Sequence, residues 1–469
     1  MANYYHWTNH GEPIPPIPPM VADQSYYASN GPREMFDNYQ QLVMDAAGPE
    51  IGTHLDQHDD DNNNIMMEDP NVEAQKFFQM LKDAQSPLWD GCDKYSVLSA
   101  SLRALTLKTD YGLSEGCFNE WMQFMGDIMP DDNRFPKNIY QAKKTVAELG
   151  LGSMKIDCCP SGCMLYYKEN EMLQNCKVCQ RQRYKRFTRR GKDKVVPLKS
   201  MWYFPLVPRL KRLYSSMQTA HEMKWHHTHQ REPSSLSHPS DAEAWRHFDE
   251  TWPDFAQEPR NVRLGLCADG FAPFDKTGRT YSCWPVIVTP YNLPSWLCMR
   301  REFMFLTIII PGPSNPKNKV DVYLRPLIDE LKMLWDDGVM TYDVSLKQNF
   351  LMRAALMWTI NDFPAYGMLS GWMTMGRLAC PICMENNRGF SLACSKKTSW
   401  FDCHRRFLPQ DHPYRRNKTS FTKGKVEVLT PPRRLSGQEI WERVQHLPSI
   451  EESQEQNPSG YGKGHNWTK

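Results

Sequence analysis

The sequence lacks the two features that would direct a chain into or across a membrane. It has no apolar run of about 18 residues, the length that a membrane-spanning helix needs, and its longest candidate, FMFLTIIIPG, is the size of a strand. The N-terminal segment MANYYHWTNHGEPIPPIPPM has neither a basic start nor an apolar stretch, so it is not a secretory signal. The sequence therefore predicts neither a membrane protein nor a secreted one.

A strong net charge is also lacking. The 56 Lys and Arg residues nearly balance the 54 Asp and Glu residues, and the net charge of +2 does not by itself indicate a nucleic-acid partner. The uneven distribution of basic residues along the chain is more informative than the total. With 35 prolines and a mean hydropathy of −0.64, the 469-residue chain is expected to contain long irregular segments beside its folded parts.

Cysteine is present in a pattern that favours metal over disulfides. The 14 cysteines include two CxxC pairs, which in an intracellular chain are typical of zinc ligands. In CCPSGCMLYYKENEMLQNCKVC, two close pairs are joined by a segment of hairpin length, the spacing of a zinc ribbon with four sulfur ligands. The predicted ligands are Cys159, Cys163, Cys176 and Cys179. Cys158 is an alternative to Cys159, and four buried free thiols are the alternative to a metal site.

A second group of metal ligands is predicted further along the chain. Cys380 and Cys383 form the CPIC pair, and His404 and His412 flank RRFLPQD. Together they would make a site with two cysteines and two histidines. The spacing of the histidines is longer than in a zinc finger, and Cys394 and Cys403 are alternative ligands.

Two basic segments are candidates for DNA contact. RQRYKRFTRRGKDK, residues 181–194, has eight basic residues and one acid, interleaved with Tyr184 and Phe187, which suits phosphate contact with some stacking. A solvated loop and a nuclear-import signal are the alternatives. Residues 404–434 hold nine Lys or Arg against two acids. The predicted DNA-binding residues are Arg183, Lys185, Arg186, Arg189, Arg190, Arg405, Arg406, Arg415 and Arg416. The His-rich stretch HEMKWHHTHQ indicates an exposed helix rather than a metal site.

Residues 262–366 carry the pattern of a catalytic core. VRLGLCADGFAPF, YSCWPVIVTP and EFMFLTIIIPG read as strands, DVYLRPLIDELKMLWDDG as a helix, and FLMRAALMWTIND as a further strand. This β-β-β-α-β order is the opening of a ribonuclease-H-like α/β fold. Pro285 lies inside a predicted inner strand, where it removes a backbone donor, so we expect a β-bulge there.

Two acids lie on predicted strands of this core. Asp269 falls on the first strand and Asp362 at the end of the fourth, and adjacent parallel strands could bring the two carboxylates together. Such a pair suits Mg²⁺ or Mn²⁺ and the cleavage of phosphodiesters. The alternative is that each is a turn-capping Asp, since both lie in ordinary turn sequences.

The chain resembles the transposases of CACTA-class (Spm-like) plant DNA transposons. The similarity rests on LCADGFAPF, YSCWPVIVTPYNLPSWLC, DVYLRPLIDELKMLW, WTINDFPAYGMLSGW and RLACPIC, and it continues on both sides with CPSGCMLYYKENE, CKVC, YFPLVPRLKRLY and HRRFLPQDHPYR. The resemblance implies a DDE-type core that cuts and rejoins DNA at transposon ends with Mg²⁺ or Mn²⁺, in the nucleus. It also implies that Asp269 and Asp362 are the first two catalytic acids. The family carries a single cysteine at the first ribbon position, which favours Cys159, because Pro160 follows it.

The third acid of a DDE core is the feature that the resemblance does not supply. Glu439 and Glu442 are the remaining candidates, but the family's distances place the Glu later. We therefore expect an incomplete copy that does not cleave DNA, with an unpaired sheet edge that a second copy or another partner would cover. The alternative function is a non-catalytic, zinc-dependent derivative that binds DNA or protein.

The patterns predict a succession of segments along the chain. These are a disordered N-terminus (1–70), a helical domain (71–150), a zinc ribbon with a basic arm (151–195), a connecting helical region (196–260), the partial ribonuclease-H-like core (261–370), a Cys/His insertion with a second basic arm (371–435), and a short helix with a tail (436–469). For the helical domain, packing or oligomerisation is favoured over DNA reading, because basic residues are sparse on its second and third helices.

Overall fold

The structure is a computed structural model that describes residues 67–189, 192–232, 235–272, 281–391, 397–400, 402–419 and 425–446. Nearly all of the predicted disordered N-terminus and most of the C-terminal tail lie outside the described residues. The chain divides into two compact units. Of the described residues, the first unit holds those up to Asn361 and the second those from Asp362 onward. No described helix has the length and apolar character needed to cross a membrane.

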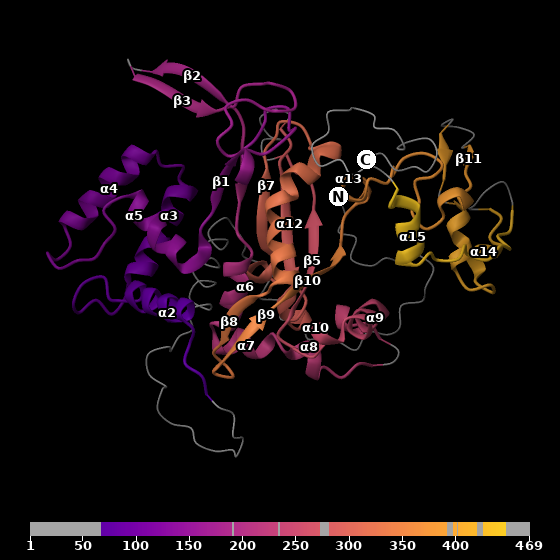
Figure 1. Ribbon diagram of the computed structural model, residues 1–469, viewed down its shortest axis with the longest axis horizontal. Coiled ribbons are helices and arrows are strands. Elements are labelled where there is room, and N and C mark those ends of the chain that lie inside the picture. Colours follow the sequence, from indigo (N-terminus) through magenta and orange to yellow (C-terminus); the bar gives the residue numbers. More distant parts are fainter. Residues whose placement is uncertain are drawn as a thin grey trace. The chain divides into compact units, whose positions relative to one another are not determined.

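A mixed sheet of six strands forms the centre of the first unit (Figure 1). In spatial order its strands are β1 (Met154–Asp157), β4 (Ser200–Tyr203), β7 (Phe305–Ile310), β6 (Trp284–Pro290), β5 (Val262–Ala268) and β10 (Ala354–Thr359). Neighbouring strands are antiparallel except β5 and β10, which are parallel. All β5 residues except Cys267 are buried, as are most residues of β6, and Leu264 and Val286 are fully buried. The first three predicted strands are therefore confirmed as β5, β6 and β7, and β5 and β10 are neighbours.

Helix α12 (Val320–Asp336) packs against β7 and β10. Its buried residues, Tyr323, Leu324, Leu327, Leu331 and Leu334, recur at helical spacing and form the face that meets the sheet. Gly338 follows with a φ of +70°, a backbone conformation that glycine adopts without strain, and the chain turns there into the next strand. The predicted helix and its glycine stop are confirmed.

The predicted fourth strand is divided into two. Residues at its start belong to β9 (Gln348–Met352), which pairs with β8 (Val339–Asp343) in a separate antiparallel hairpin. Arg353 breaks the run, because its backbone N–H donates to the Asn261 side chain and its Nε to the carbonyl of Trp335. The core strand β10 therefore begins at Ala354, and the prediction of one continuous strand was wrong.

Pro285 lies at the end of β6 that extends beyond β5. The pairing of β5 with β6 stops at Ala268 and Val286, so no β5 residue opposes the proline. On the other side of β6, the register against β7 shifts between Val286 and Ile287, next to the proline. The predicted irregularity is confirmed, and Pro285 is tolerated because its missing donor faces no β5 acceptor.

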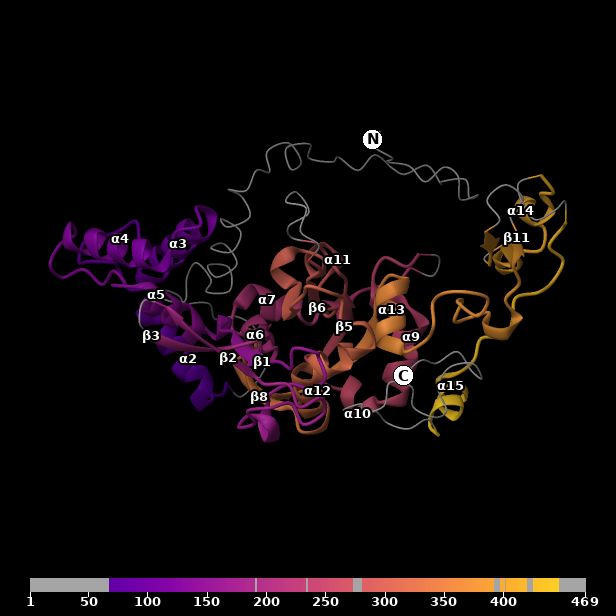
Figure 2. The same cartoon turned by 90° about the horizontal axis from the view of Figure 1, so that it is seen from above.

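The region before the sheet is helical, as its periodicity predicts. It comprises α2 (Val72–Ala84), α3 (Val97–Asp110), α4 (Glu115–Asp127), α5 (Ile139–Val146) and a π-helical turn (Ala147–Leu151). Helices α3, α4 and α5 lie close together in Figures 1 and 2, and they share one apolar core in which Phe118, Met122 and Ala142 are fully buried. Each of the four α-helices begins at an Asn or Ser whose side chain accepts a backbone N–H of the first turn.

Short helices connect β4 to β5. They are α6 (Val207–Tyr214), α7 (Met217–Glu222), α8 (Trp225–Thr228), α9 (Glu243–Thr251) and α10 (Pro253–Ala256). The prediction of an exposed His-rich helix was wrong for His226, which is 7% exposed and packs against Trp245. Burial lowers the pKa of His226 to about 3 and that of His238, which is also buried, to about 4.

The described part of the second unit consists of short elements. It includes α13 (Phe363–Ser370), the two-residue pair β11 (Phe390–Ser391) and β12 (Thr398–Ser399), a 3₁₀ segment (Asp402–Phe407), α14 (Pro413–Arg416) and α15 (Gly437–Val444). Its buried core includes Trp372 and the two CPIC cysteines. A unit with so few regular elements needs other constraints to hold its loops, and a metal site is one such constraint.

Candidate metal centres

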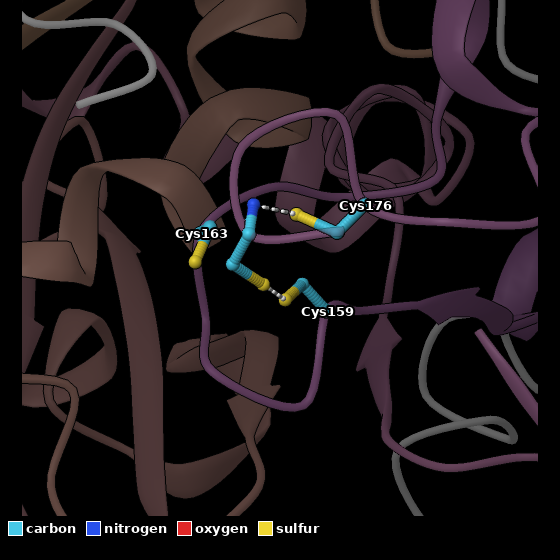
Figure 3. Close-up of side chains that lie close together, drawn as sticks. Cys159, Cys163 and Cys176 are labelled. Atoms are coloured by element: carbon cyan, nitrogen blue, oxygen red, sulfur yellow. Dashed lines mark hydrogen bonds between the residues drawn. The ribbon is translucent and has the colours of Figure 1, made fainter. Parts of the chain in front are cut away.

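The four cysteines predicted for the first site come together in the structure. The sulfur atoms of Cys159, Cys163, Cys176 and Cys179 all lie within 4.8 Å of one another. In Figure 3 the three labelled side chains, Cys159, Cys163 and Cys176, turn toward one another from the loops around β1 and before β2. We call these four residues the cysteine knuckle. Four thiols at this separation suit a tetrahedral zinc ion.

Local turns position the sulfur atoms of the knuckle. After Cys159, the N–H of Gly162 donates to the Cys159 carbonyl, and the N–H of Ser161 points to the Cys159 sulfur at 3.4 Å. The second pair repeats this arrangement, because the N–H of Cys179 points to the Cys176 sulfur at 3.5 Å. Such N–H···S contacts stabilise thiolates and orient them toward a metal.

The electrostatics of the knuckle also favour a bound cation. Burial and the neighbouring Cys159 raise the pKa of Cys163 to about 12, and burial raises that of Cys176 to about 11. Burial opposes ionisation of Cys179 too, but the Arg181 backbone amide and the neighbouring thiols outweigh it and lower its pKa to about 7. Without a cation, the cluster can therefore hold one thiolate near neutral pH but resists holding four.

Cys158 is excluded from the knuckle by its direction. Its sulfur lies 3.5 Å from the carbonyl of Ile156, away from the four-sulfur group, and burial raises its pKa to about 12. Neighbouring residues in an extended segment point to opposite sides, so only one of the two adjacent cysteines can face the metal. The structure brings Cys159 into the group, as predicted.

Helix α12 contacts the segment that carries the first two cysteines of the knuckle. Lys168 pairs with Asp329 of the helix at 2.6 Å, and Arg325 of the helix pairs with Glu169 at 2.6 Å. Gly162 has a φ of +70°, and a β-carbon there would lie 2.8 Å from the hydroxyl of Tyr323. The knuckle is thus fitted closely to the helix that covers the central sheet.

The second predicted site is formed in part. Cys380, Cys383 and His404 place their ligand atoms within 4.8 Å of one another. Burial opposes ionisation of Cys380, but hydrogen bonds from His404 and from backbone amides lower its pKa to about 7. Burial raises the pKa of Cys383 to about 11, against the effect of the neighbouring Arg406. These three residues could hold a zinc ion.

The structure does not bring the predicted fourth ligand into this group. The Nδ1 atom of His412 accepts the backbone N–H of Tyr414 at 3.2 Å, at the start of α14. Among the alternatives, Cys403 donates to the side chain of Asn387 at 3.2 Å, and Cys394 lies outside the described residues. His404 and His412 are eight positions apart, so a local turn alone does not decide which of them faces the CPIC pair.

Both predicted acids lie beyond the ends of the two parallel strands, β5 and β10, rather than on the first strand and at the end of the fourth as predicted. Asp269 comes directly after β5, is exposed, and accepts the N–H of Gly270 at 2.6 Å. Asp362 is the N-cap of α13 and accepts the N–H of Ala365 at 2.9 Å. The residues just before them are in contact, because the Ala268 N–H donates to the Asn361 side chain at 2.8 Å. Metal binding by the two carboxylates stays a prediction.

Neither candidate for the third acid joins a ligand group. Among the residues that the structure describes, the groups of three or more possible ligands are the two that contain cysteine. Glu439 instead accepts the N–H of Ser436 in a capping box of α15 and pairs with Arg433. Glu442 accepts from Gln438 one turn away.

Several predicted DNA-binding arginines are used inside the fold. Arg183 pairs with Asp157 at 2.8 Å and donates to the carbonyls of Glu171 and Leu173. Arg405, Arg406 and Arg415 are buried and donate to backbone carbonyls of the second unit. These contacts give all four a structural role, which the sequence did not reveal because a guanidinium can donate to carbonyls as well as to phosphates. Lys185, Arg186 and Arg416 are exposed, Arg189 ends β2, and Arg190 lies outside the described residues.

Part of the chain matches a known protein family. Residues 233–447 match the family described as transposase family tnp2, a range that includes β5 to β10, both acids and the second cysteine group. A search of curated proteins found no match. The matched range leaves out the cysteine knuckle, and it covers a little under half of the chain. The match supports a transposase-derived protein.

Proposed function

We propose that this chain derives from a DDE-type DNA transposase of the CACTA (Spm-like) class, with a ribonuclease-H-like core. The strand arrangement supports the proposal most directly. Within the family match, β7, β6 and β5 form an antiparallel sheet, α12 follows, and β10 returns parallel to β5. This is the order in which such a core begins, and it places the ends of β5 and β10 side by side.

Asp269 and Asp362 are the proposed catalytic pair. Parallel strands end at the same edge of a sheet, and the contact between Ala268 and Asn361 brings the two chain segments together one residue before each acid. Hard carboxylate oxygens suit Mg²⁺ or Mn²⁺, which would polarise a phosphodiester and activate water. Since no third acid joins the pair among the described residues, we expect metal binding without DNA cleavage.

A manganese titration tests the acid pair. Followed by electron paramagnetic resonance, Mn²⁺ binding to the zinc-loaded chain should weaken at least tenfold in Asp269→Asn and in Asp362→Asn. Asp110→Asn, an exposed acid at the end of α3, is the matched control and should bind like the parent. Unchanged binding in both test variants would overturn the proposed pair.

A nicking assay on supercoiled plasmid tests the expected inactivity. The chain should leave the plasmid intact with either metal. Nicking that disappears in Asp269→Asn would refute inactivity and would make Glu439→Gln and Glu442→Gln the next variants to examine.

A non-catalytic DNA-binding derivative is the second candidate function. It is favoured by the intact cysteine knuckle and by the exposed basic residues beside it, both outside the family match. In this case the chain would act in the nucleus on DNA, such as transposon ends, with structural zinc. The described strands leave β10 at the edge of the sheet, where a second copy or another protein would pair. DNA binding that survives in Asp269→Asn, together with an intact plasmid, supports this function.

A further inference from the structure

Strands β2 (Tyr184–Arg189) and β3 (Lys192–Pro197) form a ribbon that stands apart from the central sheet (Figure 1). No other described strand pairs with it. Residues 185–188 of β2 and 193–195 of β3 are exposed. An isolated two-stranded ribbon is of marginal stability in water, so a ribbon of this kind needs an anchor or a partner.

The anchor is the cysteine knuckle. Arg183, directly before β2, pairs with Asp157 of β1 and stacks on the ring of Tyr166, while its carbonyl accepts the N–H of Leu198 just after β3. The N–H of Cys176 donates to the carbonyl of Arg181. The base of the ribbon, where β2 begins and β3 ends, is therefore held by the residues that surround the predicted metal site.

The cations of the ribbon lie on both of its faces. Side chains alternate along a strand and cross-strand partners share a face. The register pairs Lys185 with Val196 and Phe187 with Lys194 on one face, and Arg186 with Val195 on the other. These three cations make no ion pair with a described residue, whereas the ribbon's acid, Asp193, accepts the hydroxyl of Thr188. A flat anionic surface could meet only one such face at a time.

We propose that the ribbon inserts into the major groove of duplex DNA, with each face turned toward one phosphate backbone. The major groove is wide enough for a two-stranded ribbon, and it has phosphates along both walls, which matches cations on both faces. Six residues per strand give a length of about 20 Å, enough to reach across the groove. The inference rests on the proposed DNA-acting function and names the groove and the residues that would serve it.

Fluorescence anisotropy with a labelled 30-base-pair duplex tests the ribbon, using the full zinc-loaded chain. Lys185→Ala with Lys194→Ala removes two cations of one face and Arg186→Ala removes one of the other, and each change should weaken binding. In the triple variant, the slope of log K against log salt should fall in magnitude by about 2.7, or about 0.9 per phosphate contact. At 0.1 M salt that corresponds to a loss of up to about 500-fold.

A matched triple variant controls for net charge. Lys76→Ala, Lys82→Ala and Lys143→Ala remove three exposed cations from helices α2 and α5 and should leave binding within about twofold of the parent. Zinc content and far-ultraviolet circular dichroism should be unchanged in both triple variants. If the two triple variants lose affinity equally, the ribbon has no special role and the inference is overturned.

Groove-specific competitors test the placement. Methyl green, which occupies the major groove, should displace the protein, whereas the minor-groove ligand netropsin should not. Displacement by netropsin alone would refute insertion into the major groove. If the parent chain binds no duplex at all, the proposed DNA-acting function itself is wrong. Binding that is unaffected by the ribbon substitutions would remove only the ribbon inference.

Discussion

Arg183 and Arg186 belong to the same basic segment, yet the structure gives them opposite roles. The side chains of Arg183 and Asp157 are 12% and 13% exposed, and the pair is joined by two guanidinium contacts of 2.8 Å. Arg186 lies on the exposed ribbon, and its side chain forms no ion pair with a described residue. We predict that Arg183→Ala destabilises the protein, whereas Arg186→Ala leaves its stability unchanged and weakens DNA binding.

The expected loss follows from the contacts of Arg183. Among the described side chains, removing the guanidinium leaves the Asp157 carboxylate with the Ser200 hydroxyl as its remaining donor, and it also removes the contacts with two carbonyls and two aromatic rings. A hydrogen bond to a charged group contributes about 1.5–3 kcal/mol, and an exposed cation–π contact about 0.5–1 kcal/mol. Because solvent screens the partly exposed pair, we expect a total of about 3 kcal/mol.

Thermal unfolding measures this difference. At about 2 °C per kcal/mol for a large domain, the melting temperature of Arg183→Ala should fall by roughly 6 °C. Arg186→Ala should stay within about 1 °C of the parent, since exposed substitutions change stability by less than about 0.5 kcal/mol. Arg183→Lys should be intermediate, because lysine keeps the charge but cannot form the two-pronged contact. If Arg183→Ala melts with the parent and loses only DNA affinity, the structural assignment of Arg183 is refuted.

Three further predictions concern zinc, backbone geometry and pH. Elemental analysis should find zinc in the parent and less zinc in the double variant Cys176→Ser with Cys179→Ser and in Cys380→Ser. The variant His412→Ala should keep its zinc, and a loss of zinc there would contradict a second site made of Cys380, Cys383 and His404 alone. Gly162→Ala should destabilise the knuckle by about 1–2 kcal/mol or more in urea unfolding, because of its positive φ and the close Tyr323 hydroxyl. Gly126→Ala, on an open helical face, should instead be neutral or stabilising; similar losses in both would rule out the geometric reason. The native pKa of His238, about 4, lies below the unfolded value of about 6.5, so the unfolded chain binds the extra proton and stability should fall as pH drops from about 6.5 to about 4. In urea unfolding at a series of pH values, His238→Gln should lose less stability than the parent between about pH 6.5 and about pH 4, by up to about 3 kcal/mol. Identical pH profiles for the variant and the parent would contradict the lowered pKa of His238 in the folded protein.

The sequence by itself determined the elements whose causes are local. The spacing of Leu324, Leu327, Leu331 and Leu334 specifies helix α12, because one face of a helix recurs every three or four residues. The close cysteine pairs specify the knuckle for the same reason, since a turn of three or four residues brings both sulfur atoms to one side. The strands of the core and the irregularity beside Pro285 also follow from short-range pattern.

Only the tertiary structure decided which side chains of like type are used inside the fold. From the sequence alone, Arg183 and Arg186 have the same predicted role, but Arg183 pairs with the largely buried Asp157 carboxylate and donates to the carbonyl of Glu171. His404 and His412 are likewise equivalent as candidate ligands in the sequence. In the structure His404 lies beside the CPIC pair, whereas His412 accepts the backbone N–H of Tyr414. The hairpin β8–β9 was missed because Arg353 breaks the strand through contacts with Asn261 and Trp335, which are distant in sequence. Hydrogen bonds between distant segments carry no periodicity, so the one-dimensional pattern does not contain them.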